Sequence, residues 1–264
     1  MGLLPIEVVV RLGAFAGVLG LMVVWETLAP RRTLRVGRRR WSANLTLSVL
    51  NTLVVRFAVP LGTYGAAELA VDRGWGLFNL TSGPLALEFV AAVLLMDLVV
   101  YLQHRLFHVV PFLWRFHKVH HADNDVDVTT GLRFHTVSMV LSMGVKMSAA
   151  VLLGASPPAV LVSETALNLT AMFNHANVRM PVALDRVLRW FIVTPDMHRV
   201  HHSVDAGEMN RNFGFNFPWW DRMLGTYRDQ PAAGHQATTN GLREHQADAD
   251  QSLFWIMALP FRRR

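Results

Sequence analysis

Residues 85–108 read LALEFVAAVLLMDLVVYLQHRLFH, an apolar run that ends in two histidines, His104 and His108. The apolar part, from Leu85 to Leu102, is close to the length of about 20 residues that a helix needs to cross the hydrocarbon core of a bilayer. Histidines four residues apart on a helix lie on the same face. The stretch therefore predicts a membrane helix that carries a pair of imidazoles at one end.

The rest of the chain is also rich in apolar segments. Of its 264 residues, 52% are hydrophobic and only 17% are charged. Runs at 5–29 and 45–70 predict two further spanning helices. Runs at 137–153 and 157–173, separated by the breaker sequence GASPP, predict a helical hairpin. We therefore expect an all-α integral membrane bundle of about three spanning helices plus a hairpin, with a helical cap on the cytosolic side that carries the histidines.

The arginines indicate how the chain is oriented. The formal charge is +6, and six arginines fall between Arg31 and Arg40, directly after the first apolar run. A run of arginines beside a membrane span usually marks the cytosolic face of the membrane and only rarely a nucleic-acid contact. We therefore expect this loop to be cytosolic, and we expect no nucleic-acid partner. This orientation puts the N-terminus outside and every histidine cluster on the cytosolic side.

Histidine clusters are the most informative motif. The chain has 12 histidines and no cysteine, which excludes disulfides, thiolate zinc sites and iron–sulfur clusters. Eight of the histidines form one H-x-x-x-H and two H-x-x-H-H clusters: His104 and His108; His117, His120 and His121; His198, His201 and His202.

The spacing of the clusters suggests metal chemistry. Positions i, i+3 and i+4 share one face of a helix, so three such faces can surround a common centre. Eight imidazoles exceed what one ion with four to six ligands can use, and two metal ions are the economical interpretation. Imidazole alone does not choose between iron, zinc and copper. His135 and His175 lie beside the predicted hairpin, and Asp97, Tyr101, Asp196 and Asn177 are candidates for orienting the ligands.

With these motifs, the chain resembles the superfamily of fatty acid hydroxylases and sterol desaturases over roughly residues 85–228. The matching segments are Asp97 to His108, Pro111 to His121, Arg133 to His135, Asn174 to Asn177, Thr194 to Ser203, Asn212 to Gly214 and Trp220 to Tyr227. One departure is Thr136, which stands where a common family form has a proline after the middle histidine.

The resemblance implies a membrane-bound oxidoreductase with two iron ions, in which zinc can replace iron in purified protein. Such an enzyme uses dioxygen to hydroxylate or desaturate a C–H bond of a lipid, sterol or related apolar substrate. The implied metal ligands are His104, His108, His117, His120, His121, His135, His175, His198, His201 and His202. All of them except His135 and His175 are also the implied catalytic residues.

The resemblance also divides the chain and implies partners. We expect N-terminal membrane helices and the arginine loop at 1–84, the hydroxylase-like catalytic domain at 85–230 and a polar, loosely ordered tail at 231–264. The sequence contains no G-x-G-x-x-G nucleotide fingerprint. Electrons would therefore come from a separate ferredoxin- or cytochrome-type donor with its reductase.

Two other functions fit the same residues. A dizinc enzyme could use a metal-bound hydroxide for hydrolysis, and a catalytically silent protein could bind only metal or lipid. The pattern does not distinguish an alcohol product from an alkene, and it does not identify the substrate. His235 and His245, which lie in the polar tail, are not expected to bind metal.

Overall fold

The computed structural model describes residues 6–81, 83–246 and 251–262, and this part of the chain is helical, without strands. Its longer helices are α1 (Ile6–Leu28), α2 (Trp41–Ala58), α3 (Gly62–Asp72), α5 (Leu85–Val109), α6 (Pro111–His121), α7 (Thr136–Leu153) and α8 (Pro157–His175). Its short helices are η1 (Gly37–Arg40), α4 (Leu77–Leu80), η2 (Val128–Leu132), α9 (Val182–Leu188), α10 (Pro195–His201), α11 (Ala206–Met209), α12 (Trp219–Met223), α13 (Gly234–Ala237), η3 (Arg243–His245), α14 (Leu253–Ala258) and η4 (Leu259–Phe261).

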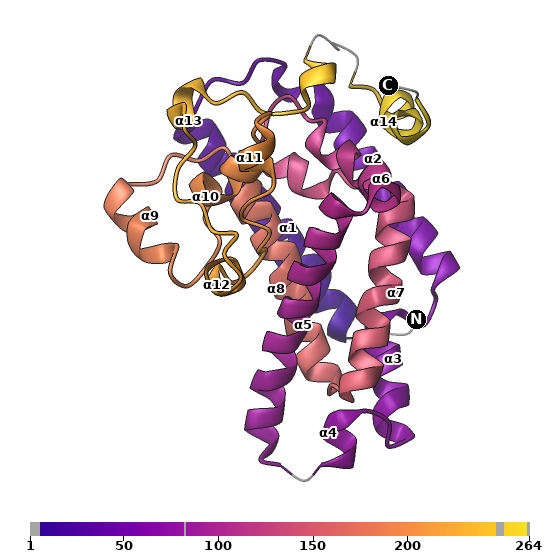
Figure 1. The fold of residues 1–264 in the computed structure, drawn as a ribbon. Helices are drawn as coiled ribbons and strands as arrows, with labels where there is room; N and C mark the ends of the chain where they lie inside the picture. The colour runs from indigo at the N-terminus through magenta and orange to yellow at the C-terminus, as the bar shows by residue number, and fades with distance from the viewer. Residues whose placement is uncertain (1–5, 82, 247–250, 263–264) are drawn as a thin grey trace.

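The long helices form a bundle that matches the predicted membrane region (Figure 1). Four segments of the described chain are long and apolar enough to cross a bilayer: Ile6–Leu28, Gly37–Leu80, Leu85–Val109 and Thr136–Leu153. Many of their large apolar side chains are exposed, as lipid-facing residues would be. The predicted all-α membrane bundle is confirmed.

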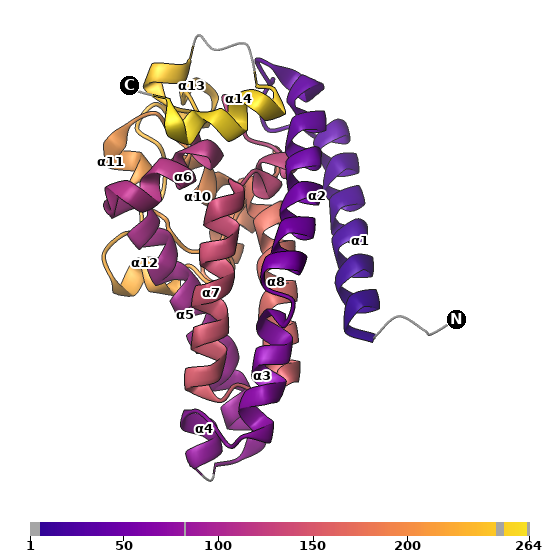
Figure 2. The same cartoon turned by 90° about the vertical axis from the view of Figure 1, so that its right-hand side faces the viewer.

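Local sequence explains where these helices bend or end. Pro60 lies between α2 and α3, where its missing N–H interrupts the helical hydrogen bonds. Val110 is extended because the next residue, Pro111, disfavours a helical conformation before it, and Pro111 then begins α6. Gly154 ends α7 with φ +66, and a Cβ there would lie 2.6 Å from the side-chain amide of Asn79. These breaks return α6 and the end of α8 to the same end of the bundle (Figure 2).

A charged cluster joins four helices inside the bundle. The Glu164 carboxylate on α8 accepts from Lys146 Nζ at 2.6 Å and from Arg11 Nη2 at 2.9 Å. The Thr63 hydroxyl on α3 donates to the same carboxylate at 2.9 Å. Removing one partner from a buried ion pair leaves the others without compensation. Glu164 therefore holds α1, α3, α7 and α8 together.

We expect Glu164→Ala to destabilise the protein by about 3–5 kcal/mol, the usual cost of breaking a buried charge pair. The measurement is the thermal unfolding midpoint in detergent micelles. Glu68→Gln is the control, because Glu68 is exposed on α3. An unchanged midpoint in Glu164→Ala would show that the cluster does not stabilise the bundle.

The cap is built from α6 and the short helices after α8, at one end of the bundle (Figure 1). Here the expectation of a loosely ordered tail is wrong for the described residues 231–246 and 251–262. Trp255, Ile256 and Leu259 are buried in one apolar cluster with Leu47 of α2 and Val119 of α6. The short run LFWIMALPF supplies enough apolar surface to fold back onto the cap, although polar residues precede it.

Candidate metal centre

Three helices bring the histidine clusters to one place. His104 and His108 occupy the last two turns of α5. The turn at Val110 then directs α6 so that His117 and His121 contact the α5 histidines, whereas His120 contacts His175 of α8. About 80 residues separate the second and third clusters in the sequence, and the hairpin of α7 and α8 brings the two clusters close together in space.

The third cluster lies on α10, a helix of seven residues. The Thr194 hydroxyl caps this helix by accepting from the backbone N–H of Met197, and Pro195 occupies the first turn. His198 and His201 lie on α10, and His202 follows directly after it. The cap and the proline determine the direction of a helix that is too short to be stable alone.

Nine histidines form two neighbouring groups whose nitrogens converge. Within each group, one nitrogen from each ring lies within 4.8 Å of the others. The five-histidine group is His104, His108, His117, His121 and His201, and the four-histidine group is His120, His175, His198 and His202. Rings from the two groups touch, since the His121 and His202 centroids are 4.7 Å apart. The arrangement offers two adjacent sites for metal ions.

Hydrogen bonds to the backbone decide which ring nitrogen is free in the five-histidine group. His104 Nδ1 lies 2.7 Å from the carbonyl of Phe213, and His201 Nδ1 lies 2.8 Å from the carbonyl of Arg211. A carbonyl only accepts, so in both neutral rings Nδ1 carries the proton and Nε2 carries a lone pair. These two Nε2 atoms face each other at 3.1 Å. Two facing lone pairs repel, and a cation between them would convert the repulsion into coordination.

The four-histidine group repeats this geometry. His175 Nδ1 lies 2.6 Å from the carbonyl of Ala171, which leaves its Nε2 with a lone pair. That Nε2 lies 3.1 Å from Nε2 of both His120 and His198. Two nitrogens on one ion, each bound at about 2.0–2.1 Å and at right angles, are about 3 Å apart. The observed spacing therefore fits a metal ion in each group.

Buried nitrogens without partners support the same conclusion. Within the described part of the chain, the Nε2 atoms of His108, His121 and His202 have no hydrogen-bond partner and are shielded from solvent. Burial of a polar atom without a partner is costly, and a metal ion would remove that cost. The residues present thus fit two metal ions.

Electrostatics keeps the rings in the form that binds metal. Burial lowers the pKa of His117, His120, His121, His198 and His202 well below the ordinary value, and neighbouring imidazoles lower it further. The pKa of His201 is lowered in the same way. The rings are therefore neutral at pH 7, and metal can bind without first displacing a proton from them.

Aromatic side chains surround the two groups. Phe134 stacks on His120 with centroids 4.4 Å apart and planes 10° apart. Phe213 meets His108 edge-on at 5.1 Å, and Trp114 lies 5.0 Å from the same ring. These rings limit access of water to the nitrogens.

The residues expected to orient the ligands lie nearby but bind other groups. Asp97 accepts from Trp220 Nε1 at 2.8 Å, and the Tyr101 hydroxyl pairs with Thr226 Oγ1 at 2.8 Å. Asp196 pairs with Arg31 and Arg199, whereas Asn177 binds the backbone of Arg32. Among the nine histidines, the Nδ1 hydrogen bonds seen in the described part of the chain are those of His104, His175 and His201, and all three go to backbone carbonyls instead of carboxylates.

His135 lies apart from both groups. It caps α7, with Nδ1 accepting from the backbone N–H of Val137 at 3.2 Å. Its ring packs against Phe116, 5.2 Å away between centroids. We therefore leave His135 out of the proposed ligand set. His235 and His245 are also outside both groups.

Asp221 is a positioning residue whose role the sequence motif did not reveal. Its carboxylate accepts from the N–H groups of Phe213 and Gly214, both at 2.8 Å, and from the Thr226 hydroxyl at 2.7 Å. It thereby holds the loop whose Phe213 carbonyl orients His104. Asn212, which directly precedes Phe213 in this loop, has φ +54, a conformation that asparagine tolerates better than most residues.

We expect Asp221→Ala to weaken metal binding by about 10- to 100-fold, the usual cost of losing a group that orients a ligand. Competition with a chelator measures this affinity. Asp221→Asn keeps one acceptor oxygen and should recover part of the loss. Asp205→Ala, at an exposed position, is the control. Wild-type affinity in Asp221→Ala would contradict the positioning role.

Comparison with known proteins places this geometry in a family. Residues 89–226, just over half of the chain, match the fatty acid hydroxylase family. The chain belongs to this family. The matched segment of this family member contains all nine converging histidines. The predicted superfamily is therefore confirmed.

Curated relatives share the same segment. The chain is 33% identical to an ornithine lipid hydroxylase of Rhizobium tropici over 56% of its own length and 44% of that protein. It is 31% identical to human cholesterol 25-hydroxylase, over 52% and 49% of the two chains. It is 28% identical to human alkylglycerol monooxygenase, over 69% and 38%. The match thus spans less than half of each relative's length, and no solved structure matches the chain.

Proposed function

We propose that the protein is a membrane-bound lipid hydroxylase that works with two iron ions and dioxygen. The observation that carries the proposal is the pair of adjacent, buried histidine groups at one end of an apolar helix bundle. The family and the relatives support it, because the three relatives are named for hydroxylation or monooxygenation of lipids or a sterol.

The proposed ligands are the nine histidines of the two groups: His104, His108, His117, His121 and His201 for one ion, and His120, His175, His198 and His202 for the other. Imidazole suits iron as well as zinc, so the reaction decides between them. Breaking an unactivated C–H bond needs a stronger oxidant than any side chain. Two bound iron ions would supply the electrons that activate dioxygen.

The chain's own groups prepare the site for this chemistry. The carbonyls of Phe213, Arg211 and Ala171 hold the proton of each ring on Nδ1 and turn Nε2 inward. Phe134 and Trp114 cover the rings and limit side reactions with water. The histidines lie at the end of the apolar helix α5, so an apolar substrate could approach them from the lipid phase without crossing water.

The location of the site and the source of electrons complete the proposal. By the positive-inside rule, the arginine-rich connection between α1 and α2 supports a cytosolic location for the cap. A ferredoxin- or cytochrome-type donor with its reductase would deliver electrons to the cap from that side.

Isotope labelling tests the proposed reaction. Lipids from cells with and without the gene are compared by mass spectrometry, which identifies the substrate as the species that gains one oxygen atom. The purified protein is then supplied with that lipid, a reductant and labelled dioxygen. We expect the label in the product hydroxyl group. Label taken up only from labelled water, without need of a reductant, would instead support the dizinc hydrolase.

A further inference from the structure

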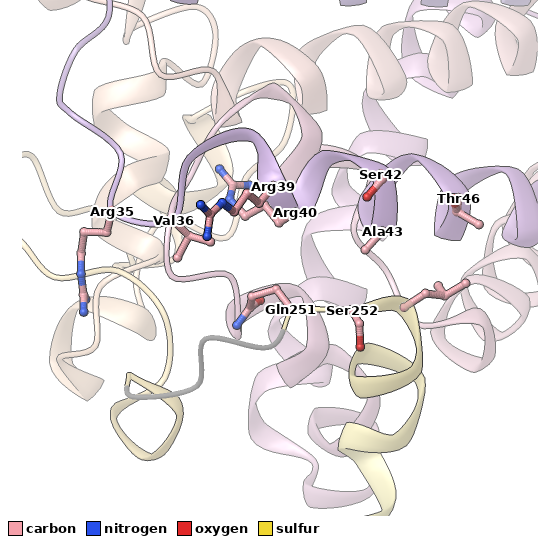
Figure 3. Close-up of a pocket in the computed structure, with 10 residues that line it drawn as sticks. Arg35, Val36, Arg39, Arg40, Ser42, Ala43, Thr46, Gln251 and Ser252 are labelled. Carbon is pink, nitrogen blue, oxygen red and sulfur yellow. The ribbon is translucent and has the colours of Figure 1, made fainter.

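A polar pocket lies away from the metal centre, between the start of α2 and the residues that lead into α14 (Figure 3). Its volume is about 790 Å³, and it is partly open to solvent. The polar residues that line it are Arg35, Arg39, Arg40, Ser42, Thr46, Gln251 and Ser252. Gln251 and Ser252 lie across the pocket from the arginines and Ser42 (Figure 3).

Among the described residues, Arg39 of the pocket has no acidic partner. Arg40 is paired with Asp123 and Asp127, but no acidic residue lines the pocket among the described residues. Arg39 is exposed and makes no hydrogen bond or ion pair within the described part of the chain. A guanidinium in this state matches a phosphate group, to which arginine can donate two parallel hydrogen bonds.

Gln251 is a second and independent sign of a ligand. Its side chain is only 5% exposed, yet neither its amide nitrogen nor its amide oxygen has a hydrogen-bond partner among the described residues. Buried amides in proteins are normally hydrogen-bonded. A ligand with both an acceptor and a donor, such as a phosphate ester beside a hydroxyl group, would satisfy both atoms.

One face of α2 continues from the pocket into the apolar bundle. Ser42 and Thr46 line the pocket, and Val49, Leu53 and Phe57 follow them at helical spacing on the same face. These three apolar side chains are all more than half exposed, and Phe57 is 81% exposed. A polar pocket above an exposed apolar stripe fits a lipid, with its headgroup in the pocket and an acyl chain along the helix.

We propose that this pocket binds the headgroup of an anionic phospholipid of the phosphatidylglycerol type. Arg39 and Arg35 meet the phosphate, and Gln251 pairs with the phosphate ester and a headgroup hydroxyl. Arg40 lines the pocket and also binds Asp123, two residues after His121. A bound lipid would therefore stabilise the position of Arg40 and, through it, of the segment at Asp123 that follows the second histidine cluster. The inference does not depend on the reaction that the metal centre performs.

Binding is tested with phosphatidylglycerol added to the purified full chain in neutral detergent micelles. We expect this lipid to raise the thermal midpoint, and phosphatidylcholine to raise it much less. Arg39→Gln and Gln251→Leu should each weaken phosphatidylglycerol binding by about tenfold to a hundredfold, the loss expected for a charge-assisted or buried hydrogen-bond group. Native mass spectrometry measures the bound lipid directly.

Arg186→Gln is the matched control, because Arg186 is an exposed arginine of the cap on α9. It should bind phosphatidylglycerol as the wild type does. Equal effects of the two lipids, or wild-type affinity in both pocket variants, would overturn the proposal. A full shift with soluble glycerol phosphate alone would overturn the lipid assignment and indicate a site for free phosphate esters.

Discussion

Replacing His201 or His120 with alanine is expected to abolish product formation and to lower the metal content. His201 belongs to the five-histidine group, where its Nε2 lies 3.1 Å from that of His104. His120 belongs to the four-histidine group, 3.1 Å from Nε2 of His175. Each variant therefore removes a ligand from a different proposed ion. Metal content per chain and oxidation of the identified lipid are the two measurements.

The control for these variants is His245→Ala, which should leave metal content and turnover unchanged. His245 lies in η3, outside both groups, and its ring meets Trp255 edge-on. A helical circular dichroism spectrum close to that of the wild type shows that each variant has folded. Wild-type turnover in His120→Ala would contradict its assignment as a ligand.

Removing the metal is expected to lower the thermal midpoint by about 10 °C or more. A ligand present at about 1,000 times its dissociation constant stabilises a folded protein by about 4 kcal/mol, and each kcal/mol shifts the midpoint of a chain of this size by about 2–4 °C. The metal-free state leaves facing lone pairs, such as those of His104 and His201, and buried nitrogens without partners.

The midpoint is measured before and after treatment with a chelator, and again after iron is returned. Recovery with iron shows that the loss is not irreversible damage. The same midpoint with and without metal would mean that the histidines pack without needing a cation.

Helical periodicity was sufficient to predict the main features of the site. The i, i+3, i+4 spacing of His117, His120 and His121 predicted one imidazole face, and the number of apolar runs between the clusters predicted that all three lie at one end of the bundle. The sequence did not show that the histidines divide into two groups, or which histidine belongs to which group. That division depends on ring directions, which the α5 to α6 turn and the short helix α10 determine.

The partners of the rings could not be predicted for a different reason. The carbonyls of Phe213 and Arg211 belong to an irregular loop, and backbone carbonyls have no signature in a sequence. His135 was a candidate ligand because of the family resemblance and its position beside the predicted hairpin. In the structure His135 caps α7, and its neighbour Phe134 reaches the site instead. The polar tail was misjudged because its composition hides one short apolar segment around Trp255.

Metal analysis of protein purified from iron-replete cells tests the central claim most directly. Two groups of converging histidines predict two metal ions per chain, with iron as the principal metal. A content of one ion per chain, or of none in protein that still oxidises lipid, would contradict the two-ion centre.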